Sequence, residues 1–371
     1  MLKKTVMLTI TENCNLNCTY CYEKNKSLKS MSYATALDII SRELSEEDEY
    51  DECEIQFFGG EPFLEFEIIK EVCEYIWSCN FKKKYKCFAT TNGTFVHGEI
   101  KQWLTKNKDR FVCSLSLDGT RTAHNINRCD SFDDINIDFF KNTWPLQTLK
   151  MTISPESLPY LAESVIYIHD LGFDFHNNLA YGADWTDPSL INILQEQLKI
   201  LVDYYIEHPK IKHCSLLGMN IENVLLGRTI NRWCGAGVSM RSYDAYGNVY
   251  PCHMFQPLSF DLPQPEEKYG VAFDELNTID PKCADCPILN VCPTCYGHNY
   301  SATGDISKRD SGLCVFTKEI VLATSYLWIR KIQKYGIKSV CPSVETACAI
   351  FDGAKFIQME LPERMNDQAV P

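Results

Sequence analysis

The chain has 371 residues, a formal net charge of −13 at pH 7 and 45% hydrophobic residues. This length and apolar content favour one large folded domain with a smaller one, and they exclude a disordered chain. An acidic protein is a poor match for nucleic acid, whose phosphates attract basic side chains. No apolar run in the sequence approaches the roughly 18 residues that span a membrane, and the first residues lack the pattern of a cleaved export signal. We therefore expect a cytoplasmic protein without a nucleic-acid or membrane partner.

The sequence contains nineteen cysteines. In a chain without an export signal, so many cysteines indicate metal or redox chemistry rather than a disulfide framework. Ten of them belong to the spaced motifs described below. For most of the others we expect burial, because a free cysteine behaves as a small hydrophobe. These nine are Cys53, Cys73, Cys79, Cys87, Cys113, Cys129, Cys214, Cys341 and Cys348.

From residue 5 to about residue 210, short β-rich runs alternate with amphipathic helical windows. Six such repeats predict a parallel sheet with helices outside it. The sheet either opens as a doubly wound fold or curls into a partial barrel, and periodicity does not choose between them. Ser32 is expected to cap the first helix. The predicted strands are 5–11, 54–58, 86–91, 111–117, 149–153 and 173–179, and the predicted helices are 33–45, 64–78, 98–106, 134–142, 157–170 and 189–207.

Three cysteines follow the first predicted strand closely, at Cys14, Cys18 and Cys21. Thiolates are soft ligands that suit iron–sulfur clusters or zinc, and both usually take four protein ligands. Three ligands on one loop leave one corner of a cluster open for a substrate. The alternative is a zinc site whose fourth ligand lies elsewhere.

Glycine-containing turns follow the next three strands, at Phe58–Pro62, Thr91–Thr94 and Ser116–Gly119. In parallel α/β folds the ligand lies at the carboxyl ends of the strands. Glycines at such ends let the backbone approach a ligand closely. Each turn is a weak signal by itself, but together with the cysteine loop they predict one binding site at this edge.

The cysteine loop, with Tyr20 inside it, resembles the CxxxCxxC motif of the radical S-adenosylmethionine (radical SAM) enzymes. In that family the open iron of a four-iron cluster binds SAM, and electron transfer yields a 5′-deoxyadenosyl radical that abstracts hydrogen from the substrate. The resemblance implies SAM as cofactor and an α/β fold, the partial (βα)6 barrel.

The turns extend this resemblance. The run Gly59-Gly60-Glu61-Pro62 matches the family's GGEP motif, and 115–119 with 124–128 looks like a segment of anaerobic sulfatase maturases. Arginine suits bidentate carboxylate binding, although a surface ion pair is the alternative for Arg128. The resemblance implies SAM contacts at Tyr20, Gly59, Gly60, Glu61, Asn92, Ser116 and Arg128.

A second group of cysteines begins at Cys234. Cys234 and Cys252 bracket a predicted hairpin that turns at Gly247, and two CxxC pairs, five residues apart, follow. A zinc ribbon is one interpretation, but seven thiolates exceed one zinc site and suit two clusters better. The later cysteines are Cys283, Cys286, Cys292, Cys295 and Cys314.

This pattern resembles the SPASM extension of radical SAM enzymes, which carries auxiliary four-iron clusters. By the family's interleaved ligation, the second auxiliary cluster takes Cys283, Cys286, Cys292 and Cys314, and the first takes Cys234, Cys252 and Cys295. The first cluster then has three thiolates, because the hairpin carries one fewer cysteine than in sulfatase maturases. A separate difference from the family pattern is that the final pair is CxxC rather than CxxxC. We expect an open iron there, or a fourth ligand such as His253 or His298. The expected total is three 4Fe–4S clusters, one of which binds SAM.

His253 stands where sulfatase maturases carry an aspartate thought to take the substrate proton. It is a candidate catalytic base, and the loss of the aspartate counts against sulfatase maturation. The implied domains are a radical SAM barrel over 1–215, a linker helix over 216–232, a SPASM domain over 233–317, and a C-terminal helix and tail over 318–371. A helix is predicted over 318–335, ended by Gly336, and the role of the polar tail from residue 341 is not interpretable.

We interpret the chain as a radical SAM–SPASM oxidoreductase that forms a thioether or carbon–carbon crosslink in a ribosomally made peptide. The alternatives are formylglycine formation of the anaerobic sulfatase maturase type, a SPASM enzyme acting on a small molecule, and a non-enzymatic iron–sulfur or zinc module. The expected partners are the peptide or protein substrate and a one-electron reductant of the flavodoxin or ferredoxin type. The chain begins at the first predicted strand, so leader recognition is expected to need a separate protein or another surface.

Overall fold

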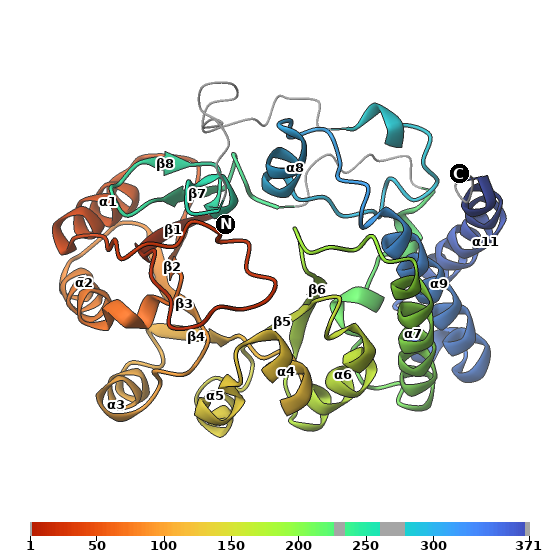
Figure 1. Cartoon of the computed structure of the whole chain (residues 1–371), viewed down its shortest axis with the longest axis horizontal. Coiled ribbons are helices and arrows are strands. Elements are labelled where there is room, and N and C mark those ends of the chain that lie inside the picture. The colour runs from red at the N-terminus through yellow and green to blue at the C-terminus, as the bar shows by residue number, and fades with distance from the viewer. Residues whose placement is uncertain (1, 226–233, 260–278, 368–371) are drawn as a thin grey trace. The chain divides into compact units, whose positions relative to one another are not determined.

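The structure is a computed structural model that describes residues 2–225, 234–259 and 279–367 (Figure 1). The chain forms two compact units, each built from several segments, and we describe them in turn. The first unit comprises Met1–Leu117, His124–Lys150 and Cys234–Leu276, and the second comprises Asp118–Ala123, Met151–Trp233 and Asn277–Pro371.

A six-stranded sheet forms the centre of the first unit, in the order β4-β3-β2-β1-β7-β8. Neighbouring strands are parallel except for the antiparallel pair of β7 and β8. β1 is buried on both faces over most of its length, as a central strand of a parallel sheet must be. The strands are β1 (Lys3–Thr11), β2 (Glu52–Gly59), β3 (Lys84–Thr91), β4 (Phe111–Leu115), β7 (Met240–Tyr243) and β8 (Val249–Tyr250).

Helices of the first unit cover one face of this sheet (Figure 1). The hydroxyl of Ser32 accepts the Thr35 N–H at 3.0 Å and caps α1, as predicted. Ala36, Ile40 and Leu44 then bury the inner face of that helix. The helices are α1 (Tyr33–Ser45), α2 (Phe66–Ser78), α3 (Gly98–Lys106) and α5 (Ile137–Thr143), while the short α4 (Arg121–Asn127) crosses the boundary between the units.

β7 pairs with β1 through a parallel register from Thr5↔Met240 to Leu8↔Tyr243. The predicted hairpin is confirmed, since β7 and β8 are antiparallel and Gly247 has a φ of +88° in the turn. Its pairing with β1 was not predicted, because a strand of four residues carries little pattern and its partner lies more than two hundred residues earlier.

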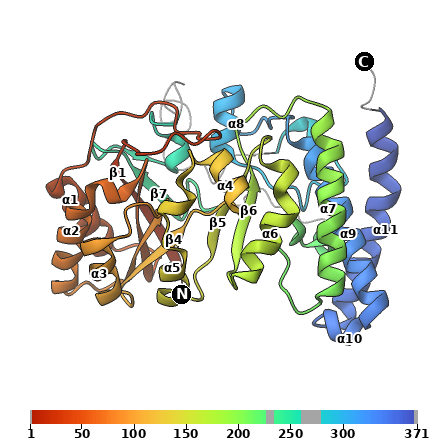
Figure 2. The ribbon, with the colours of Figure 1, turned by 60° about the horizontal axis from the view of Figure 1, so that its bottom comes forward.

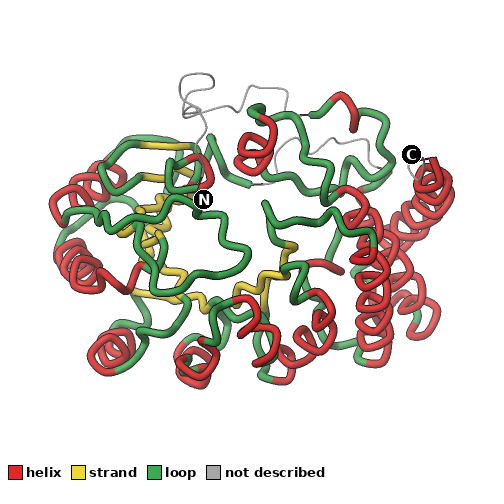
Figure 3. The backbone as a smooth tube through the Cα atoms, in the orientation of Figure 1, coloured by secondary structure: helices red, strands yellow, loops and turns green. Residues whose placement is uncertain are grey.

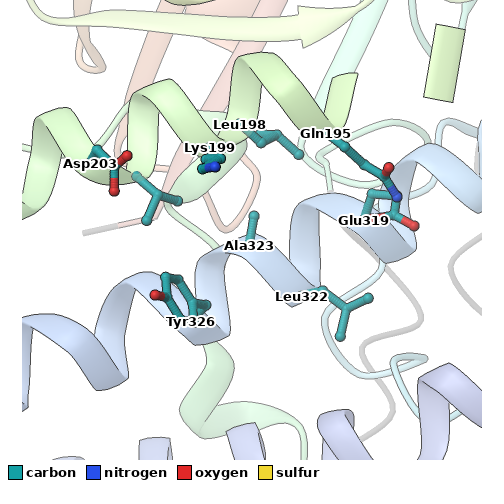
Figure 4. Close-up of a pocket in the computed structure, with 9 residues that line it drawn as sticks. Gln195, Leu198, Lys199, Asp203, Glu319, Leu322, Ala323 and Tyr326 are labelled. Atoms are coloured by element: carbon teal, nitrogen blue, oxygen red, sulfur yellow. The ribbon is translucent and has the colours of Figure 1, made fainter. Parts of the chain in front are cut away.

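The second unit contains most of β5 (Leu149–Ile153), its partner β6 (Phe175–Leu179) and a layer of long helices. α7, α9 and α11 lie side by side in both ribbon views (Figures 1 and 2). A groove of about 370 Å³ runs between α7 and α9, with Leu198, Leu322 and Tyr326 along it (Figure 4). The helices are α6 (Leu161–Asp170), α7 (Ser189–Glu207), α8 (Tyr296–Thr303), α9 (Cys314–Tyr335), α10 (Ile337–Val340) and α11 (Val344–Asp367).

The tail beyond residue 341, left uninterpreted from the sequence, is mainly the helix α11. Its buried positions recur at three- and four-residue steps, a helical signal that the polar composition obscured. Gly353 lets α11 approach the turn at Ile221, because a Cβ there would lie 2.5 Å from the Ile221 carbonyl oxygen. The buried positions are Ala347, Ile350, Ala354, Ile357 and Leu361.

α9 ends at Gly336 as predicted, with φ +79°. The predicted linker helix over 216–232 is replaced, where the structure describes it, by 3₁₀ turns at Ser215–Leu217 and Ile221–Asn223. Residues 226–232 of that prediction lie outside the described residues. Among the helices that the structure describes, none is both long and apolar enough to cross a bilayer.

Candidate active site

The first three motif cysteines lie between the end of β1 and the start of α1. Figure 3 shows this segment as a long loop. All three cysteines are half-buried and outside any disulfide. The loop folds on itself, because the Cys21 N–H donates to the Cys18 carbonyl at 3.1 Å and the Leu16 N–H donates to Cys14 Sγ at 3.4 Å. Burial raises the pKa of the Cys14 thiol to about 11, and the neighbouring Cys18 adds to the rise. The three thiols thus occupy one small region at the end of β1.

Two charged residues that sequence reasoning missed lie beside these thiols. Lys26 Nζ donates to the Leu16 carbonyl at 3.2 Å and also hydrogen-bonds the Cys21 thiol. Burial raises the pKa of the Glu23 carboxyl to about 7, and its Oε1 has no hydrogen-bond partner among the described residues. Single charged residues in a loop produce no periodic signal, so only the fold reveals their place.

The glycines of the second motif let β2 end against the cysteine loop. The Gly60 N–H donates to the Thr11 carbonyl at 3.0 Å, and a Cβ on Gly60 would lie 2.3 Å from the Asn13 carbonyl oxygen. Gly59 has φ +130°, a conformation that other residues rarely adopt. Both glycines are therefore required by the close packing of the two strand ends.

Glu61 of the same motif is 1% exposed. Its carboxylate accepts the backbone N–H of Phe63 at 3.1 Å and that of Asn92 at 2.8 Å. Burial raises its pKa to about 7, although these hydrogen bonds favour the charged form. Glu61 therefore organises the turns after β2 and β3 through buried hydrogen bonds.

Asn92 and Arg128 both contact the cysteine loop. The Asn92 amide donates to Asn15 Oδ1 at 2.9 Å, and Asn15 Nδ2 donates to Thr94 Oγ1 at 3.0 Å. The guanidinium of Arg128 lies over the ring of Tyr20, 5.4 Å from its centroid. Arg128 is 8% exposed, which argues against the surface ion pair that was its alternative.

Ser116 lies at the same edge of the sheet. It is 8% exposed, and its N–H donates to the Thr91 carbonyl at 2.9 Å. The structure thus brings Tyr20, Gly59, Gly60, Glu61, Asn92, Ser116 and Arg128 to the ends of β1–β4 in the first unit. Their contacts with SAM remain a prediction.

His253 follows Cys252 and packs beside the same loops. Its ring centroid lies 4.6 Å from that of Phe58 and 5.6 Å from that of Tyr22. Burial lowers the pKa of His253 to about 4, so the imidazole is neutral at pH 7. Its Nδ1 is buried and has no hydrogen-bond partner among the described residues. A catalytic role for His253 remains a prediction.

Five of the later cysteines line one cavity of about 220 Å³ in the second unit, namely Cys283, Cys286, Cys292, Cys295 and Cys314. All of them except Cys295 are predicted ligands of the second auxiliary cluster. Burial, and then the neighbouring thiols, raise the thiol pKa of Cys283, Cys292 and Cys314, at Cys292 to about 12. Nowhere in the described part of the chain do three His, Cys, Asp or Glu side chains converge on a single ion. The thiols instead surround a space, as the larger body of a four-iron cluster requires.

The donor sets therefore fit the implied groups, with three thiols on the β1 loop and five thiols around the cavity, four of which are predicted ligands of one cluster. When bound, an iron–sulfur cluster supplies one-electron transfer there. The remaining candidates are divided between the units, with Cys234 and Cys252 in the first and Cys295 in the second. His298 Nε2 lies 3.0 Å from the Asp310 carboxylate and leaves Nδ1 for another partner. Ligation of the first auxiliary cluster remains a prediction.

None of the nineteen cysteines, all of which lie in the described residues, forms a disulfide bond. Of the nine for which burial was the general expectation, Cys129 and Cys348 are exposed and Cys79 is half-buried, while the other six are buried.

Residues 8–143 match the family profile described as the Radical SAM superfamily. These residues form a radical SAM domain, which places the chain among enzymes. The radical SAM domain predicted from the cysteine loop is thereby confirmed over these residues.

Known proteins match the chain over different lengths. An uncharacterized protein of Methanocaldococcus jannaschii is 30% identical over 179 residues, which are 46% of this chain and 59% of that protein. The cysteine-type anaerobic sulfatase-maturating enzyme of Clostridium perfringens is 34% identical over 129 residues, 32% of this chain and 34% of that enzyme. The radical SAM cyclopropyl synthase TigE of Paramaledivibacter caminithermalis is 20% identical over 354 residues, 86% of this chain and 73% of that protein. The chain thus spans 59% and 34% of the length of the first two relatives.

Two solved structures share the fold. Native anSMEcpe with bound AdoMet and Cp18Cys peptide has a TM-score of 0.67 at 19% identity, over 90% of this chain and 99% of that one. Streptococcus suis SuiB bound to its precursor peptide SuiA has a TM-score of 0.57 at 17% identity, over 84% of this chain and 76% of that one. The α/β radical SAM fold is therefore confirmed.

Proposed function

We propose that this chain is a radical SAM–SPASM peptide maturase that forms a thioether or carbon–carbon crosslink in a ribosomally made peptide. The observation that carries the proposal is the pair of thiol sites, with three half-buried thiols on the loop after β1 and five thiols around one cavity in the second unit. The first suits a cluster that binds SAM, and the second suits an electron-transfer cluster.

The residues around the β1 loop have defined tasks in this proposal. Arg128 and Ser116 hold the carboxylate and ribose of SAM, while the backbone at Gly60 contacts its amino group. Buried Glu61 and Asn92 hold the loops rigid, and Tyr20 supports the Arg128 guanidinium. Such fixed side chains position SAM without reorganisation during the reaction.

The proposed reaction balances as a two-electron oxidation of the peptide. SAM, cleaved with one electron from a flavodoxin- or ferredoxin-type reductant, would supply the radical that takes one hydrogen atom from a peptide carbon, leaving methionine and 5′-deoxyadenosine. The carbon radical would then join a cysteine sulfur or a second carbon, with loss of one proton and one electron. That electron would pass to a cluster held by the cysteines of the second unit and return to the reductant.

Peptide chemistry is supported by the solved structure of SuiB, which contains its precursor peptide. Within the proposal, the chain works in the cytoplasm, and a separate protein or another surface recognises the peptide leader. Formylglycine formation is the second candidate, favoured by the 34% identity to the Clostridium perfringens sulfatase-maturating enzyme.

The test is anaerobic reconstitution, followed by counting iron and sulfide and adding dithionite and SAM. About twelve irons, as three four-iron clusters, together with 5′-deoxyadenosine support the proposed enzyme. About eight irons with 5′-deoxyadenosine would mean that one auxiliary cluster is missing. Zinc without SAM cleavage would overturn the proposal.

The substrate is then tested with two peptides. One is a cysteine-containing peptide encoded beside the gene, and the other carries a sulfatase cysteine motif. Loss of two hydrogens by mass spectrometry in the first supports crosslinking. Conversion of cysteine to formylglycine in the second would favour the sulfatase alternative.

A further inference from the structure

The cysteine-lined cavity of the second unit also contains the positive charge of Arg309, which belongs to none of the sequence motifs. Arg309 Nη1 donates to Cys292 Sγ at 3.0 Å. Arg309 Nε is buried and has no acceptor among the described residues. A buried donor without an acceptor is unfavourable and calls for an explanation. Arg309 Nε can therefore donate a hydrogen bond to an acceptor other than the thiols.

The backbone holds Arg309 firmly at this position. Its N–H donates to Asp280 Oδ2 at 2.9 Å, and Asp280 Oδ1 accepts the Lys282 N–H at 2.9 Å. Asp280 is 4% exposed and caps the turn that leads into Cys283. One buried carboxylate therefore ties Arg309 to the first ligand of the CxxC pair.

Arg309 is itself one of the residues that line the cavity, together with the thiols. A four-iron cluster held by four thiolates is negatively charged, and one added electron makes it more negative. A fixed cation beside such a cluster stabilises the more negative state.

We propose that Arg309 is a positioning residue that raises the reduction potential of the cluster held by Cys283, Cys286, Cys292 and Cys314. Nη1 donates to the Cys292 thiolate, and Nε donates to a sulfide of the cluster. The step is the one-electron reduction of [4Fe–4S]²⁺ to [4Fe–4S]⁺, with no bond broken and no proton taken up. The inference rests on the second auxiliary cluster of the proposed function, but it does not depend on SAM cleavage or on the peptide.

The test is an anaerobic redox titration with dithionite, followed by electron paramagnetic resonance (EPR). The signal of this cluster is identified as the one that Cys286→Ala removes. Arg309→Gln is expected to lower the ratio of reduced to oxidised cluster about tenfold at a fixed potential, which is 59 mV for a one-electron couple. Arg309→Lys keeps the charge without the Nε donor and is expected to show a smaller fall. Lys308→Gln, the exposed neighbour, removes the same charge and should change nothing.

Three results would overturn the inference. The first is an unchanged potential in Arg309→Gln with full iron content, and the second is zinc in place of iron at this cavity in the unaltered protein. The third is loss of iron from both Arg309→Gln and Arg309→Lys, since Arg309 would then only hold the site together. 5′-Deoxyadenosine formation by the unaltered protein is measured separately. If the unaltered protein fails to cleave SAM, yet the Arg309 variants show the predicted change in reduction potential, the proposed function is contradicted and this inference is supported.

Discussion

Glu61 Oε1 accepts the hydroxyl of Thr91 at 2.8 Å, so one buried carboxylate joins the turn after β2 to the end of β3. The Glu61 carboxylate also accepts the backbone N–H groups of Phe63 and Asn92. Its hydrogen bonds therefore fix the turns that lie next to the cysteine loop. Glu61 also contacts the loop directly, because its backbone N–H donates to the Asn13 carbonyl at 2.9 Å.

Replacing Glu61 tests this role. Glu61→Ala leaves buried donors without an acceptor and is expected to lower the free energy of unfolding by about 3 kcal/mol, while Glu61→Gln costs about 1 kcal/mol. Urea unfolding of the apo protein measures both. Glu67→Ala, on the exposed start of α2, is the matched control and should be neutral. Equal stability of Glu61→Ala and the control would show that the carboxylate does not support the turns.

Asn92 links the end of β3 to the cysteine loop through Asn15. Asn92→Ala is expected to slow 5′-deoxyadenosine formation about tenfold, the effect of roughly 1.4 kcal/mol on the barrier, because the loop loses its anchor. Rates are measured with dithionite and SAM in excess. Asn80→Ala, on an exposed loop, should retain the normal rate. A normal rate in Asn92→Ala would mean that the anchor is dispensable.

Cys14→Ala removes one ligand of the predicted SAM cluster. We expect it to abolish 5′-deoxyadenosine formation and to leave about eight irons, the content of two auxiliary clusters. Iron analysis and chromatography of the SAM products are the measurements. Exposed Cys348→Ala is the control for loss of a thiol. Continued SAM cleavage in Cys14→Ala would refute the assignment of the first cluster.

The second unit is expected to lose stability in mild acid through His213. Lys331 Nζ donates to His213 Nε2 at 2.9 Å, and burial, then the Lys331 charge, lower the pKa of His213 from 6.5 to about 4. Because the folded pKa is the lower one, protonation favours the unfolded state. The stability is complete above pH 6.5 and falls as the pH drops towards 4, by about 2 kcal/mol at pH 5.

Thermal melts of the apo protein between pH 7.5 and pH 5 measure this effect. His213→Gln should flatten the pH dependence, and the exposed His208→Gln should leave it unchanged. If all three proteins lose stability in parallel, His213 is not the titrating group.

The strand and helix pattern of the first two hundred residues could be predicted because its apolar periods are long and regular. Predicted helices such as α1, α3 and α7 have the bounds seen in the structure. α4 was missed because its seven residues carry no clear apolar face. The motif residues could be placed at strand ends because parallel topology brings those ends to one edge.

Other parts of the site could not be predicted because they depend on contacts between distant segments. Lys26 and Arg309 are ordinary charged residues until the fold places them beside thiols. Asn92, predicted as a SAM contact, has a hydrogen bond to the cysteine loop that no motif reveals. The sequence predicts the ligands, whereas the fold shows which other side chains contact them.

One edge of β1 pairs with β7, a strand that the ribosome synthesises much later than β1. Until residues 240–243 emerge, the edge of this apolar strand has unpaired N–H and C=O groups, and the whole segment 151–233 of the other unit is synthesised in between. An open, apolar strand edge is a template for pairing with another chain. A fragment that ends before Met240 is therefore expected to aggregate, and the first unit can be produced in soluble form only together with the segment that carries β7.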